Sequence, residues 1–278
     1  MTPGGPFVRI DRDEEVRWHR FTGEKVTDLR MRYPGSVPIV YHERSDLLVA
    51  KSLSGDGIRL TIYRGGSGPV KEEVTYNTTA DEILSACITD AEGVWVLHQG
   101  RYESEAVRQF IVSRTTARFS EWENYFLAGV EVSEQGTVIE KPVNIFCGRD
   151  DTELYLSTVL YAGNDRRSVL RLPTLSVLQA YLYQFDPVEG LLSPVTAVIT
   201  RGTGRIRDRY DAVSGRYYLF QGGLLTIQEG WGFPEEHRYE GAEDALLAVK
   251  EGTVRLMLIE RSGKKVRGRI APLSMRGD

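Results

Sequence analysis

The sequence predicts an all-β chain that folds as a β-propeller with five blades. Three observations support this prediction: a strand-and-hairpin pattern that recurs five times, a scarcity of helical periodicity, and a length of 278 residues. A chain of this length fits either two ordinary domains or one large β domain. Two β-sandwich domains, divided near residue 135, are the alternative fold.

Five segments share one pattern of apolar residues. Each starts on an apolar or aromatic residue and returns to one seven positions later and again nine positions later; the starting residues are Val40, Ile88, Cys147, Tyr210 and Val249. A two-residue step is the period of a strand with one buried face, and the polar residues between the apolar positions are typical of a hairpin loop. Each segment therefore predicts a β-hairpin.

The spacing of these segments favours a propeller. Their starting residues lie 39 to 63 positions apart, and propeller blades repeat every 40 to 50 residues or so, with loop insertions adding to that length. We predict one propeller domain, residues 37–278, closed by an N-terminal segment, residues 1–36, that adds a strand to the last blade. The expected blades are approximately 37–80, 81–135, 136–190, 191–241 and 242–278.

One segment, TARFSEWENYFLAG at 116–129, departs from the strand pattern. Its aromatic residues recur at helical spacing and Gly129 stands where a helix would stop, so we predict a helix with its aromatic face in the core. Trp95 occupies a repeated apolar position of the second segment, which predicts packing between neighbouring blades. His98 follows the repeated Leu97 and points to the opposite face of its strand, where we expect it to be exposed.

Composition excludes several classes of partner. The net charge of -4 arises from 35 basic and 39 acidic residues that are well mixed, unlike the clustered cations of a nucleic-acid site. No apolar run reaches the roughly 20 residues of a membrane span, and the N-terminus has no uninterrupted apolar stretch typical of a secretory signal. We expect cytoplasmic synthesis. The final location is left open, and a virion is one of the locations considered. Cys87 and Cys147 are expected to be small buried hydrophobic residues and not part of a disulfide framework.

The sequence contains no motif for a nucleophile elbow, phosphate loop, dinucleotide site or paired-histidine metal site, so we expect no cofactor and no metal. Carboxylates are the remaining source of catalytic groups. Most of them fall in or beside the predicted hairpin loops, where Asp and Glu are ordinary turn residues. If the chain is an enzyme, the catalytic candidates are Glu43, Asp90, Asp150 and Asp211, with Asp151, Asp208 and Glu251 also considered.

Two segments have the composition of binding surfaces. RGTGRIRDRYD at 201–211 mixes arginines with aspartates, and QEGWGFPEEHRY at 228–239 places aromatic residues in a loop rich in Gly and Pro. Arginine and aromatic side chains are enriched at protein contacts, and aromatic rings also stack on sugars. The binding candidates are Arg205, Arg207, Arg209, Trp231, Phe233 and Tyr239.

The absence of catalytic motifs favours a non-catalytic structural or binding module in a larger assembly, such as a phage virion or tail component, with protein subunits as partners and a glycan as a further ligand. A carbohydrate-active enzyme, similar in chemistry to a glycoside hydrolase, is the alternative. It requires two carboxylates in the central funnel, about 5 to 9.5 Å apart according to mechanism. A lectin-like module, which binds sugars through loop aromatics without turnover, is the third hypothesis.

Overall fold

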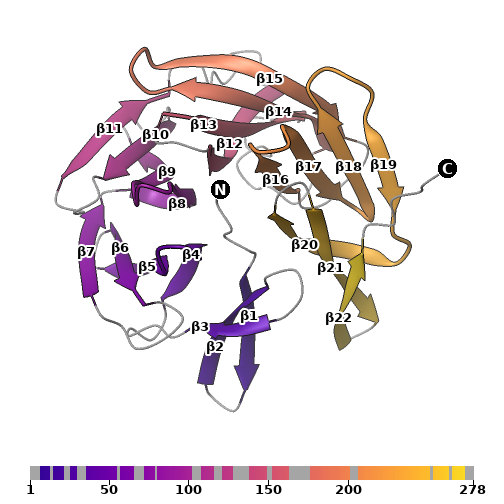
Figure 1. Cartoon of the computed structure of the whole chain (residues 1–278), viewed down its shortest axis with the longest axis horizontal. Helices are drawn as coiled ribbons and strands as arrows, with labels where there is room; N and C mark the ends of the chain where they lie inside the picture. The colour runs from indigo at the N-terminus through magenta and orange to yellow at the C-terminus, as the bar shows by residue number, and fades with distance from the viewer. Residues whose placement is uncertain are drawn as a thin grey trace.

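The computed structural model of the chain, shown in Figure 1, is a ring of small antiparallel sheets. No helix occurs among the residues that it describes. Those residues are 7–12, 15–21, 26–29, 36–54, 57–65, 72–78, 80–101, 108–115, 121–127, 138–148, 152–162, 176–200, 206–250, 253–262 and 265–272. The prediction of an all-β, five-bladed propeller is confirmed, because each of the five repeated segments gives one sheet of the ring.

The first three blades have four strands each, in sequence order across the sheet. Blade 1 contains β4 (Val37–His42), β5 (Leu47–Ser54), β6 (Gly57–Arg64) and β7 (Glu72–Thr78). Blade 2 contains β8 (Ala80–Ile88), β9 (Val94–Arg101), β10 (Arg108–Thr115) and β11 (Trp122–Phe126). Blade 3 contains β12 (Val138–Cys147), β13 (Leu154–Ala162), β14 (Ser176–Asp186) and β15 (Leu191–Ile199).

The last two blades follow the same order. Blade 4 contains β16 (Arg207–Asp211), β17 (Arg216–Gln221), β18 (Leu224–Glu229) and β19 (Glu235–Arg238). Blade 5 has three strands, β20 (Ala242–Lys250), β21 (Thr253–Ser262) and β22 (Lys265–Pro272).

The N-terminal segment closes the ring as a separate sheet. It forms β1 (Phe7–Arg12), β2 (Glu15–Phe21) and β3 (Val26–Leu29), and in the described part of the chain none of these strands pairs with blade 5. This sheet stands between blade 1 and blade 5 (Figure 1). Its Leu29 packs with Tyr41, Leu48 and Tyr63 of blade 1, so side-chain packing replaces the shared strand that we expected.

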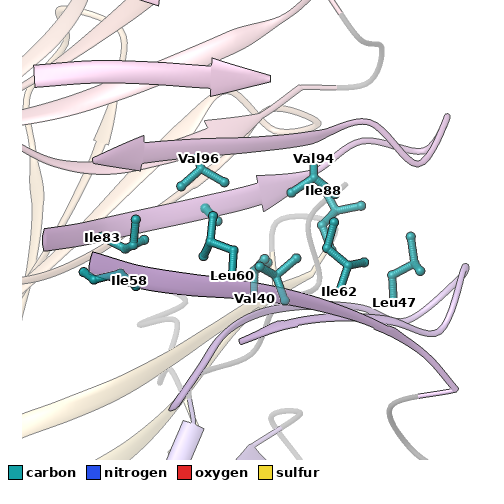
Figure 2. Packing of buried hydrophobic residues seen from close by; sticks show 11 residues of the cluster. Val40, Leu47, Ile58, Leu60, Ile62, Ile83, Ile88, Val94 and Val96 are labelled. Atoms are coloured by element: carbon teal, nitrogen blue, oxygen red, sulfur yellow. The ribbon is translucent and has the colours of Figure 1, made fainter. Parts of the chain in front are cut away.

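The hydrophobic core is divided among the interfaces between neighbouring sheets. In Figure 2, Val40, Leu60 and Ile62 of blade 1 face Ile83, Ile88 and Val96 of blade 2. Corresponding clusters lie between blades 2 and 3, blades 3 and 4, and blades 4 and 5. Blades 1 to 4 therefore bury both faces against neighbouring sheets, with the N-terminal sheet covering the other face of blade 1, which is the physical reason for the ring.

Trp95 confirms this arrangement. Its side chain is fully buried in the cluster between blades 2 and 3, together with Leu97 of its own strand and Leu156 of blade 3. The predicted role in packing between blades is therefore correct.

The helix predicted at 116–129 is wrong where the structure describes that segment. Trp122–Phe126 is β11, paired antiparallel with β10. Trp122 packs against the core between blades 1 and 2, whereas Tyr125 packs against the core between blades 2 and 3. Residues three apart lie on opposite faces of a strand, and only a strand lets these two rings enter two different cores.

The prediction for the cysteines is also wrong. Cys87 at the end of β8 and Cys147 at the end of β12 form a disulfide, with 5.6 Å between their Cα atoms. Both residues are buried, as expected, but they covalently join the first strands of blades 2 and 3.

Candidate functional site

The first strand of each blade lies nearest the centre of the ring (Figure 1). These inner strands are β4, β8, β12, β16 and β20. Four of them carry charged or amide side chains that interact with one another, and we name this group the inner-strand cluster. It consists of Glu82 from β8, Lys141 and Asn144 from β12, Arg207, Asp208 and Arg209 from β16, and Asp244 from β20.

Asp208 is the most deeply buried member of the inner-strand cluster, with 1% of its surface exposed. Tyr217 donates a hydrogen bond of 2.8 Å from its hydroxyl to Oδ2, and Asn144 donates from Nδ2 to Oδ1. Burial, and then the charge of Asp208, raise the pKa of Tyr217 well above its ordinary value. Tyr217 therefore stays protonated and serves as a donor to the carboxylate.

A β-bulge aligns the polar residues of β12. The register with β13 shifts between Pro142 and Asn144, so Lys141 pairs with Val159 and Asn144 with Ser157. Val159 and Ser157 are two residues apart and share a face of β13. The bulge therefore places Lys141 and Asn144 on the same face of β12, although they are three residues apart in sequence. Asn144 reaches Asp208 of blade 4, whereas the ammonium of Lys141 lies beside Glu82 of blade 2.

Glu82 and Lys141 form the most accessible pair of the inner-strand cluster. Their carboxylate and ammonium groups are 3.9 Å apart, and 53% of the Glu82 side chain is exposed. Lys51 approaches the same region, because its Nζ donates a hydrogen bond of 2.8 Å to the carbonyl oxygen of Ile83. Burial lowers the pKa of Lys51, and the charge of Glu82 partly opposes this shift. The exposed carboxylate of Glu82 can therefore exchange its 3.9 Å contact with Lys141 for a contact with a ligand.

Arg207 and Asp244 join blades 4 and 5. The guanidinium donates from Nε to Oδ1 at 2.9 Å and from Nη2 to Oδ2 at 2.8 Å. These hydrogen bonds, with the charge of Asp244, raise the pKa of Arg207 above its ordinary value. The two-point geometry fixes the orientation of both groups, and both remain partly exposed.

Of the catalytic candidates from the sequence, Asp208 belongs to the inner-strand cluster, whereas Glu43, Asp90 and Asp211 lie elsewhere. Glu43 is exposed and pairs with Arg20 of the N-terminal sheet at 3.0 Å. Asp211 is buried and accepts hydrogen bonds from the backbone of Val213 and the hydroxyl of Ser214, which is a turn-capping role. Asp150, Asp151 and Glu251 lie outside the described residues, as does Arg205.

Asp90 belongs to a contact that resembles a catalytic triad in composition. Its Oδ1 is 3.2 Å from Nε2 of His42, whose Nδ1 is 2.6 Å from the hydroxyl of Ser45. The backbone N–H of Ser45 also points to Nδ1 at 3.3 Å, and the His42 side chain is 1% exposed. Nδ1 accepts from the turn and the ring is closed to solvent, so this group connects blades 1 and 2.

The aromatic loop of blade 4 is only partly as predicted. Trp231 is 67% exposed and Phe233 is fully exposed. The side chain of Gln228 holds the loop by donating to the carbonyl oxygens of Gly230 at 3.0 Å and Gly232 at 2.8 Å. Tyr239, in contrast, is half-buried and packs against the core between blades 4 and 5. Trp231 and Phe233 are therefore exposed on a loop whose backbone is hydrogen-bonded to Gln228.

His98 is buried, contrary to our prediction. Its Nε2 is 2.6 Å from the hydroxyl of Ser113, and that hydroxyl donates to Oδ1 of Asn124 at 2.6 Å. Because the single hydroxyl proton of Ser113 is already used, Nε2 carries the ring proton and donates it. Burial lowers the pKa of His98 to about 4.

This lowered pKa predicts a loss of stability in mild acid. An unfolded histidine has a pKa near 6.5, so below that pH the unfolded chain binds a proton that buried His98 does not. The free energy of unfolding is therefore highest above pH 6.5 and falls as the pH drops from 6.5 to about 4. The expected loss is up to about 3 kcal/mol in the free energy of unfolding. Urea unfolding at pH 7 and pH 4.5 measures it. His98→Gln keeps a donor without the titration and should show a smaller drop; an equal drop in both proteins would contradict the assignment.

Within the described ranges, no three His, Cys, Asp or Glu side chains are grouped so as to hold a metal ion. The part of the chain with described structure also contains no helix with the length and apolar character needed to cross a bilayer.

Solved structures of enzymes share this fold. An oligogalacturonate lyase in complex with manganese aligns with a TM-score of 0.50 at 11% identity, over 93% of this chain and 74% of the lyase. A periplasmic gluconolactonase of Pseudomonas aeruginosa gives 0.48 at 13% identity, over 92% of each chain. An endo-arabinase from Bacteroides thetaiotaomicron gives 0.44 at 13% identity, over 84% of this chain and 88% of the arabinase. No protein-family model matches this sequence, and no curated protein matches it either.

The similarity to the lyase, which aligns with a TM-score of 0.50, corrects the expectation of a non-catalytic virion or tail module, because that propeller is an enzyme named for oligogalacturonate. At 11% identity, this similarity shows the fold of this chain and not its activity. Any activity must therefore be argued from the residues of the inner-strand cluster.

Proposed function

We propose that this chain is a carbohydrate-active enzyme whose substrate binds at the inner-strand cluster. The observation that carries the proposal is the presence of accessible carboxylates and cations on inner strands, in a molecule whose interfaces between blades are otherwise mainly apolar. Saccharides present many hydroxyl groups that both donate and accept, and they are bound by such mixed sets of charged side chains.

Glu82 and Asp244 are the proposed catalytic residues. They belong to β8 and β20, inner strands on opposite sides of the ring (Figure 1). Glu82 has one long contact and an exposed side chain, whereas Asp244 is held by two hydrogen bonds from Arg207. Acid–base chemistry at a glycosidic bond uses two carboxyl groups in different environments, and Glu82 and Asp244 differ in this way. The proposal also requires that the two carboxyl groups act across the funnel at about 5 to 9.5 Å from each other.

The other members of the inner-strand cluster support the site. Asp208 has both oxygens occupied by Asn144 and Tyr217 and is closed to solvent, so it orients its neighbours and does not contact substrate. Asn144 is thereby fixed beside Lys141 on the same face of β12. Rigid support of this kind keeps reacting groups in place.

We also propose that Trp231 and Phe233 bind glycan outside this site. Exposing two aromatic rings on a loop held by Gln228 has no benefit for folding, and such rings stack on the apolar face of a sugar. This loop would retain a long glycan near the enzyme without taking part in turnover.

The experiment compares wild-type protein with Glu82→Gln, Asp244→Asn and Trp231→Ala on a panel of arabino-oligosaccharides, oligogalacturonates and an aldonolactone. Release of reducing ends, formation of unsaturated product and release of acid measure the three reaction types. We expect the two carboxylate variants to lose about 100-fold or more in turnover. Trp231→Ala should lose binding to polymeric glycan and keep turnover of short substrates.

Glu189→Gln is the matched control, because Glu189 is exposed in the turn between β14 and β15, the two outer strands of blade 3. It should behave as wild type. The proposal is wrong if wild-type protein neither binds nor converts any saccharide or lactone of the panel, or if both carboxylate variants keep full turnover.

A further inference from the structure

The two arginines of β16 lie on the same side of the strand but have different partners. Arg207 pairs with Phe220 and Arg209 with Tyr218 in the ladder to β17. Phe220 and Tyr218 both belong to the core between blades 4 and 5. Arg207 and Arg209 therefore face blade 5, and Asp208 between them faces blade 3.

Among the residues that the structure describes, Arg207 has a carboxylate as an ion-pair partner and Arg209 has none. Asp244 accepts two hydrogen bonds from Arg207. Arg209 donates from Nη1 to the backbone carbonyl oxygen of Asp208 at 3.0 Å. In the described part of the chain, no carboxylate lies within ion-pair distance of the Arg209 guanidinium.

Arg209 is enclosed by protein and still reached by solvent. Its side chain is half-buried, and burial lowers the pKa of its guanidinium, against the opposing charge of Asp208. A guanidinium has five N–H donors, and burying such a charge without an anion costs free energy. The carbonyl of Asp208 satisfies one donor and supplies no full negative charge, so an anion from outside would complete the site.

We propose that Arg209 binds the anionic group of the substrate, and that the substrate is therefore an acidic saccharide. The planar fork of arginine matches a carboxylate, sulfate or phosphate group at two points. This inference rests on the proposed function, since it names the class of saccharide that the inner-strand cluster accepts.

The test measures binding by calorimetry to four probes: an oligogalacturonate, a sulfated galactose oligosaccharide, galactose phosphate and a neutral galactose oligosaccharide. Wild-type protein should bind at least one anionic probe about tenfold or more tightly than the neutral one, the scale expected for charge-assisted hydrogen bonds. The strongest of the three anionic probes identifies carboxylate, sulfate or phosphate as the group recognised.

Arg209→Gln should lose this preference and keep the affinity for the neutral probe. Arg209→Lys, which keeps the charge and loses the planar fork, should restore part of it. Arg216→Gln is the control, since Arg216 pairs with Glu229 on an exposed hairpin of the same blade, and it should bind as wild type does. Salt should weaken binding of the anionic probe and leave the neutral one unchanged, a measurement on wild-type protein that does not depend on the folding of any variant.

The outcomes separate the two proposals. Binding of neutral and anionic probes with equal affinity, or an unchanged preference in Arg209→Gln, would overturn the role of Arg209 and leave the carbohydrate-active site standing. Binding of none of the four probes would overturn the role of Arg209, whereas the carbohydrate-active site is overturned only if the wider panel of saccharides and lactone is neither bound nor converted.

Discussion

Reduction of the Cys87–Cys147 disulfide is expected to lower the free energy of unfolding by about 4 kcal/mol. The bond closes a loop of 60 residues, and a crosslink over a loop of that length removes about this much conformational freedom from the unfolded chain. Urea unfolding with and without dithiothreitol measures the difference. The double variant Cys87→Ala/Cys147→Ala should be less stable than oxidised wild-type protein. Its stability should be the same with and without dithiothreitol, because it has no disulfide to reduce.

The same variant separates the disulfide from packing effects. Both sulfurs lie in the core between blades 2 and 3, so replacement by alanine also removes buried volume. The difference between reduced wild-type protein and the double variant measures this packing contribution alone. If dithiothreitol leaves the unfolding curve of wild-type protein unchanged while its thiols become reactive, the stabilising role of the bond is refuted.

The disulfide shows what the sequence repeat predicts and what it does not: it predicts the face of the blade on which each cysteine lies, but not the distance between the two cysteines. The repeat aligns Cys147 with Ile88, and both residues face the preceding blade. Cys87, one residue before Ile88, therefore faces the following blade. Two cysteines facing each other across blades 2 and 3 follow from the repeat once the order of blades is known, but composition and spacing alone give no distance between them.

The candidate site was harder to predict for a local reason. Lys141 and Asn144 are three residues apart, and a regular strand would place them on opposite faces. The bulge between Pro142 and Asn144 brings them together, and no turn or glycine marks it in the sequence. Sequence reasoning also favoured carboxylates near hairpin loops, such as Glu43 and Asp211, whereas the accessible acids Glu82 and Asp244 lie within inner strands.

Substituting Trp95 by alanine is expected to cost about 3 to 5 kcal/mol in the free energy of unfolding, the range for removing a large aromatic side chain from a core. Trp95 is fully buried, its ring lies 5.7 Å from that of Tyr125, and the Arg114 guanidinium stands over it at 5.2 Å. Denaturant unfolding measures the loss. Trp231→Ala, which removes the same side chain from an exposed loop, should change stability by no more than about 0.5 kcal/mol.

The effects of Trp95→Ala and of the disulfide should not add. Cys87 and Trp95 are direct partners in the ladder between β8 and β9, and both side chains belong to the core between blades 2 and 3. Mutations that share a core couple by about 0.5 to 3 kcal/mol. Without Trp95 the interface loosens, and the disulfide then constrains a less ordered pair of blades. A double-mutant cycle of Trp95→Ala with Cys87→Ala/Cys147→Ala measures this coupling, and strict additivity would show that the two blades are held together by independent contacts.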